Sequence, residues 1–163
     1  LKLWQTVRLS MNKDVKMQML GQLGEAIVQN YLQDIGHNVR KSVNTFDHEK
    51  DFTVDGKPIE VKTQVPFFSE SAFTVKPNQL PKCRNVDMLF FVAVPNTKGK
   101  YKDYYGGGVY QVDPKNARWK TRTVSGTRTM KILPIEQDAV KLVHTILDKS
   151  VLRQMEELSV SEI

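Results

Sequence analysis

The segment 51–63, which reads DFTVDGKPIEVKT, decides the fold that we expect of this chain. Asp55 and Gly56 stand between two β-prone runs, and an Asp-Gly pair in that position favours a tight hairpin turn with positive φ at both central residues. Side chains alternate across a strand, so Glu60 and Lys62 are expected on one face of the second strand. The segment therefore predicts a β-hairpin that presents an acid and a base side by side.

Hydrophobic periodicity on both sides of this hairpin predicts the remaining elements. Apolar residues at three- and four-residue spacing predict helices, and the continuous apolar run at 88–94, ended by Pro95, predicts a central strand buried on both faces. The expected elements are a helix over 15–32, an extended segment over 37–43, a short helix or turn over 76–85, strands over 88–94 and 109–112, a hairpin over 117–133 and a long helix over 136–158. This order predicts an α/β fold in which helices flank a mixed β-sheet.

Length and composition predict one domain that needs no disulfide or structural zinc. The chain has 163 residues, 40% of them hydrophobic, which is enough for a core of its own. We expect residues 11–163 to form the domain, whereas residues 1–10 show no clear periodicity and are either an upstream extension or native structure. Cys83 is the single cysteine, the histidines lie far apart, and no apolar run approaches the roughly 20 residues of a membrane span. We therefore expect a cytoplasmic protein.

The net charge of +6 is concentrated in one part of the sequence. Between Pro114 and Ile135 there are basic residues but no acidic ones, and such a patch is typical of proteins that bind a polyanion. A solvated hairpin without a ligand is the alternative. Trp119 either stacks on a base or anchors this hairpin to the core. The candidate nucleic-acid contacts are Arg118, Lys120, Arg122 and Arg128 in the patch, with Lys82 and Arg84 upstream.

The hairpin at 51–63 also carries residue types suited to phosphodiester hydrolysis. That reaction requires a cation on the phosphate oxygens, an activated water and a positive group near the attacked phosphate. Mg²⁺ is typically held by one or two carboxylates, and the turn is expected to bring Asp51 and Glu60 together. The main-chain carbonyl of Val61 is a further candidate ligand. Lys62 is expected to contact the phosphate and to position or deprotonate the water. We expect Mn²⁺ to substitute for Mg²⁺.

These residues resemble the PD-(D/E)xK superfamily, the restriction-endonuclease-like nucleases. The resemblance rests on Gly24-Glu25-Ala26, then Asp51, then Ile59-Glu60-Val61-Lys62, and it covers about residues 21–95. It implies a restriction-endonuclease-like core in which Asp51 and Glu60 bind the metal. It also implies that Lys62 assists catalysis and that Glu25 completes the site.

Three points qualify the resemblance. Lys50 stands where the named motif has proline, and Asp47 is a rival to Asp51 for the aspartate role. Superfamily members carry glutamines near the site, so Gln64 and Gln79 are possible helpers, with ordinary polar surface residues as the alternative.

The sequence thus predicts a Mg²⁺-dependent endonuclease that hydrolyses DNA. One alternative is a structure-specific enzyme such as a Holliday-junction resolvase. Another is a nucleic-acid-binding protein that keeps the fold without cutting. By analogy, the small size suits a phage-encoded or resolvase-like enzyme that acts as a homodimer in the host cytoplasm.

Overall fold

A computed structural model describes residues 12–41 and 52–159. The elements, in chain order, are α2 (Lys13–Asp34), β1 (Val39–Lys41), β2 (Phe52–Val54), β3 (Lys57–Gln64), β4 (Ala72–Val75), the 3-10 helix η1 (Pro77–Gln79), α3 (Leu80–Arg84), β5 (Met88–Ala93), β6 (Gly108–Val112), β7 (Lys120–Ser125), β8 (Arg128–Pro134), β9 (Val140–Thr145) and α4 (Lys149–Ser159).

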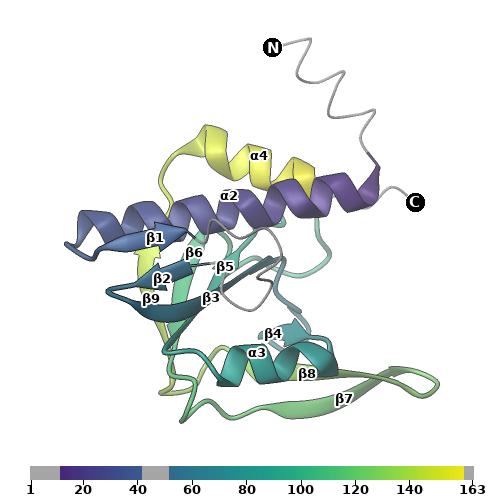
Figure 1. The fold of residues 1–163 in the computed structure, drawn as a ribbon. Coiled ribbons are helices and arrows are strands. Elements are labelled where there is room, and N and C mark those ends of the chain that lie inside the picture. The colour runs from purple at the N-terminus through teal and green to yellow at the C-terminus, as the bar shows by residue number, and fades with distance from the viewer. Residues whose placement is uncertain (1–11, 42–51, 160–163) are drawn as a thin grey trace.

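The described strands form two sheets. The larger has six strands in the order β1-β2-β3-β5-β6-β9; β3 and β5 run parallel, and the other neighbours are antiparallel. The smaller is antiparallel in the order β4-β8-β7. Helices α2 and α4 lie side by side on one face of the larger sheet, while α3 and the smaller sheet lie on the other side (Figure 1). The expected α/β class with a mixed, helix-flanked sheet is confirmed.

Strand β5 is the central strand that its apolar sequence predicted. Its side chains alternate between two hydrophobic clusters, with Phe90 and Val92 toward α2 and α4, and Leu89 and Phe91 toward α3 and the smaller sheet. All four are fully buried. Both faces of the larger sheet are therefore covered. Among the described residues, no helix has the length and apolarity needed to cross a membrane.

The predicted helix over 136–158 is wrong in its first half. Residues 140–145 form β9, an edge strand beside β6, and the helix begins only at Lys149. A spacing of three places two residues on one face of a helix but on opposite faces of a strand. Val140 and Val143 pack into the two different clusters, so the covered sheet buries both and imitates the helical pattern. Asp148 accepts hydrogen bonds from the main-chain N–H groups of Ser150 and Val151, which caps α4.

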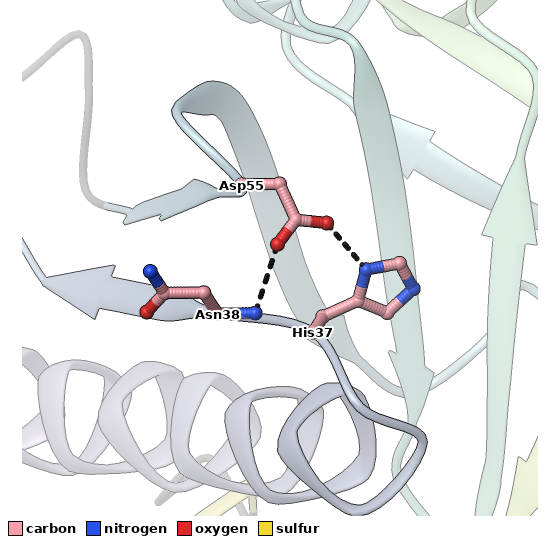
Figure 2. Close-up of polar contacts among 3 residues, drawn as sticks. All are labelled: His37, Asn38 and Asp55. Atoms are coloured by element: carbon pink, nitrogen blue, oxygen red, sulfur yellow. Dashed lines mark hydrogen bonds and ion pairs between the residues drawn. The ribbon is translucent and has the colours of Figure 1, made fainter.

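The tight turn between β2 and β3 has the predicted geometry. Asp55 and Gly56 have φ values of 51° and 82°. The Asp55 carboxylate also holds the segment after α2: Oδ2 lies 2.7 Å from His37 Nδ1, and Oδ1 accepts the main-chain N–H of Asn38 at 2.9 Å (Figure 2). These hydrogen bonds lower the pKa of Asp55 below its usual 3.8, His37 being the larger cause. Asp55 thus fastens the hairpin that carries β3 to the end of α2.

We expect Asp55→Asn to reduce the free energy of unfolding at neutral pH but not in acid. Asparagine tolerates positive φ, so the substitution removes mainly the charge. Because the folded-state pKa is lowered, the stability due to the carboxylate is present above about pH 4 and is lost as the pH falls through the folded-state pKa. Urea unfolding at pH 7 and pH 3 measures the difference, with Asp34→Asn at the exposed end of α2 as the control. An equal loss at both pH values would contradict this role.

Candidate active site on strand β3

Strand β3 divides its side chains between the two faces of the larger sheet, as the sequence predicted. Ile59 and Val61 belong to the cluster beneath α2, and Thr63 lies against Gly24 of that helix. Glu60, Lys62 and Gln64 alternate with them and point to the side of α3 and the smaller sheet. The candidate acid and base therefore share a face.

Glu60 and Lys62 form an ion pair that a third side chain completes. Lys62 Nζ lies 3.5 Å from Glu60 Oε1 and donates a hydrogen bond of 2.9 Å to Gln79 Oε1. The Glu60 side chain is only 5% exposed and that of Lys62 is 23% exposed. A buried carboxylate is costly unless a cation or hydrogen-bond donors offset its desolvation. Gln79, at the end of η1, thus fixes the ammonium group beside the carboxylate, and the structure brings these three candidates together.

Cys83 of α3 is a buried free cysteine near this group. Its side chain is buried, and burial raises the pKa of the thiol to about 11, with smaller opposing effects from the nearby Lys62 and Lys82 ammonium groups. A thiol with such a pKa is almost entirely protonated at neutral pH, whereas the thiolate is the reactive form.

Gln64 connects the two sheets. Its side-chain Nε2 donates to the main-chain carbonyl of Thr74, and its Oε1 accepts the Thr74 main-chain N–H, both at 2.7 Å. The side-chain amide therefore continues the hydrogen-bond pattern of β4. Through these two hydrogen bonds Gln64 holds the smaller sheet beside β3, two residues along the strand from Lys62.

Helix α2 approaches β3 closely at Gly24. A Cβ atom at this position would lie 2.8 Å from the Thr63 Cβ and still closer to the Thr63 hydroxyl. Glu25, the next residue, is half-buried on a helix that covers the face of β3 opposite to Glu60 and Lys62. Among the described residues, however, β2 pairs only with residues 57–59, so no described strand borders 60–64 on that side.

The predicted aspartate lies outside the described residues, as does its rival Asp47. Asp51 precedes Phe52 in the chain, and Phe52 pairs with Ile59, the neighbour of Glu60. Val61, whose carbonyl is a candidate ligand, lies on β3 and pairs with Phe90 of β5. Within the residues that the structure describes, no group of three or more His, Cys, Asp or Glu side chains is arranged to hold a metal. The described part thus supplies one buried carboxylate of the expected set.

The basic candidates lie on the smaller sheet and on α3. Lys120 and Arg122 are exposed on β7 two residues apart, so they share a face, and Arg128 begins β8. Arg118 precedes β7, and its main-chain N–H and carbonyl both bond to the side chain of Gln137. Lys82 and Arg84 occupy the last turn of α3.

One contact of this region was not predicted from the sequence. Arg122 forms an ion pair with Glu70, which belongs to a segment without a recognisable pattern. Trp119 packs against the cluster on the α3 side, so it anchors the hairpin, in agreement with the second of its two interpretations.

Comparisons of the chain with protein-family models, with curated proteins and with solved structures find no significant match.

Proposed function

We propose that this protein is a Mg²⁺-dependent nuclease that hydrolyses DNA phosphodiester bonds. The observation that carries the proposal is the pairing of the buried Glu60 carboxylate with the Lys62 ammonium group on one face of β3. Placing two charged groups in a poorly hydrated site gains little stability over an apolar pair, so such a pair calls for a chemical reason.

In the proposed site Glu60 and Asp51 hold the metal, with the Val61 carbonyl and Glu25 as further oxygen ligands. These hard oxygen donors suit Mg²⁺, which keeps several waters of its own. When bound, the ion neutralises charge on the phosphate oxygens and lowers the pKa of a coordinated water. The packing of Gly24 against Thr63 supports the participation of Glu25, since it holds the next residue of α2 close to β3.

The proposed role of Lys62 is to contact the scissile phosphate and to orient the attacking water. Gln79 holds the ammonium group at 2.9 Å and so limits its motion. A preoriented cation costs little reorganisation when negative charge develops in the transition state. Gln79 is therefore a positioning residue in this proposal.

The finer fold assignment, a restriction-endonuclease-like core, belongs to the same proposal. It is supported by the E-x-K residues, which lie on β3 within the larger mixed sheet. It is also supported by the packing of the helix that carries Glu25 against that same strand through Gly24.

DNA is the proposed substrate because cations lie on the same side of the larger sheet as Glu60. The face of β7 with Lys120 and Arg122 belongs to the smaller sheet, which Gln64 joins to β3. The β7–β8 hairpin projects from the body of the molecule (Figure 1). Cations on an extended strand can follow a phosphate backbone without reading sequence.

Lys62→Ala is expected to slow the single-turnover rate of cleavage roughly a hundredfold, the scale for one positioned acid–base or electrostatic group. DNA affinity measured in EDTA should change much less. Lys57→Ala, at the exposed start of the same strand, is the matched control and should cut normally. If Lys62→Ala lowered only the affinity, Lys62 would be a simple phosphate contact.

The proposal is tested with the purified full chain on plasmid, single-stranded and four-way-junction DNA, with Mg²⁺ or with EDTA. Cleavage that requires the metal supports a nuclease, and preference for the junction would assign the resolvase class. Binding to all three substrates without any cleavage would leave a nucleic-acid-binding protein.

A further inference from the structure

The β7–β8 hairpin borders a pocket that the proposed chemistry does not use. Its volume is about 460 Å³, and its walls include Phe67, Thr74, Arg122, Arg128, Met130 and Ile132. This volume is in the range of sites that enclose a small organic group. We call it the hairpin pocket.

The hairpin pocket opens on the face of the smaller sheet opposite to Phe73 and Leu133, whose side chains pack into the cluster on the α3 side. Arg122 pairs with Met130 across the hairpin, and Thr74 of β4 pairs with Ile132, so these side chains share one face. Gln64 bonds to the main chain of this same Thr74, and Lys62 lies two residues back along β3 on the Gln64 face. Through Gln64, the sheet that carries the pocket is joined to the strand that carries Glu60 and Lys62.

An aromatic ring is held at the pocket while remaining accessible. Phe67 is 41% exposed, yet its main-chain N–H and carbonyl both bond to Ala72. Glu70, from the loop between these two residues, forms the ion pair with Arg122. The loop is therefore fixed to β4 and to the hairpin. A large apolar side chain that is fixed but not buried gains little for folding, and it offers a ring face to a partner.

The chemistry of the walls matches one nucleotide. Phe67, Met130 and Ile132 supply an apolar surface for the face of a planar base, and the guanidinium groups of Arg122 and Arg128 are suited to a phosphate. In a duplex both faces of an internal base are stacked on its neighbours. Only an unpaired or displaced base can place a face against Phe67.

We propose that the hairpin pocket binds an unpaired nucleotide, with its base on Phe67 and its phosphate on Arg122 and Arg128. The substrate class that follows is DNA with a single-stranded, flapped or branched segment. This inference rests on the proposed nuclease function for its biological meaning, but the binding itself requires neither the metal nor Glu60.

The test compares affinities of the full chain for a labelled single-stranded oligothymidylate and for a blunt duplex of similar length, in EDTA. Phe67→Ala should weaken single-strand binding roughly tenfold, the effect expected for the loss of one base–aromatic stack, and leave duplex affinity within about twofold. Tyr101→Ala is the matched control, because Tyr101 is 50% exposed on the β5–β6 connection, away from the pocket walls. It should change neither affinity.

A second variant tests the pocket assignment even if Phe67→Ala fails to fold. Phe67→Trp should retain single-strand affinity, and its added indole fluorescence should be quenched by the oligonucleotide but not by the duplex. Equal loss of both affinities in Phe67→Ala, an equal effect of Tyr101→Ala, or no quenching in Phe67→Trp would overturn the pocket assignment.

The two proposals fail separately. If single-strand binding depends on Phe67 but the protein cuts no DNA, the pocket proposal stands and the nuclease proposal is rejected. If the protein cuts DNA with the metal but Phe67→Ala leaves single-strand binding unchanged, the nuclease proposal stands and the pocket proposal is rejected.

Discussion

Glu60→Gln is expected to slow DNA cleavage in Mg²⁺ by roughly a thousandfold, because it removes a proposed metal ligand from the centre of the site. Glutamine has the shape of glutamate, so the buried position on β3 stays filled. DNA affinity in EDTA should be unchanged or slightly tighter, since a negative charge is lost. Single-turnover rates and calorimetric titration with Mn²⁺ measure the two effects.

Glu136→Gln provides the control for this substitution. Glu136 is an exposed carboxylate between β8 and β9, and its variant should bind Mn²⁺ and cut like the wild type. If Glu60→Gln bound Mn²⁺ with wild-type affinity and still lost cleavage, Glu60 would act on the proton or on Lys62 instead of on the metal.

Gly24→Ala is expected to destabilise the fold by about 1–3 kcal/mol, the usual cost of overpacking. The added methyl would lie 2.8 Å from the Cβ of Thr63, an atom that rotation of the side chain cannot move away. Helix α2 would have to shift from β3, and Glu25 with it, so the cleavage rate should fall more than the folded fraction does. Urea unfolding and single-turnover cleavage measure the two quantities.

Gly21→Ala separates this clash from the general effect of removing a glycine. It lies one turn earlier in α2, and nothing is within 4 Å of an added Cβ. Alanine there should stabilise the protein by about 0.5–1 kcal/mol, because it reduces the entropy lost when the helix forms. Equal changes in stability for the two variants would show that the contact of Gly24 with Thr63 is unimportant.

The sequence was most informative where one physical requirement fixed the pattern. The Asp55-Gly56 turn demands positive φ at two successive positions, and few other residue pairs tolerate that. The alternation on β3 followed directly, which placed Glu60 and Lys62 together. The run at 88–94 predicted a central strand because only a strand covered on both faces is apolar throughout.

The missed features depend on contacts between segments distant in the sequence. The sequence pattern of β9 predicts a helix because Val140 packs into one cluster and the partly buried Val143 packs into the other, on the opposite face of the sheet. The side chain of Gln64 holds β4 beside β3, and the ion pair of Glu70 with Arg122 joins a loop to strand β7, far apart along the chain. Local periodicity carries no signal for such pairings.

The central claim is that the Glu60–Lys62 face of β3 catalyses metal-dependent hydrolysis of DNA. The most direct test follows cleavage of end-labelled DNA by wild-type protein and by Glu60→Gln, purified in parallel, each with Mg²⁺ and with EDTA. We predict cleavage only by the wild type and only with Mg²⁺. Cleavage by Glu60→Gln at the wild-type rate, or by the wild type in EDTA, would contradict the claim.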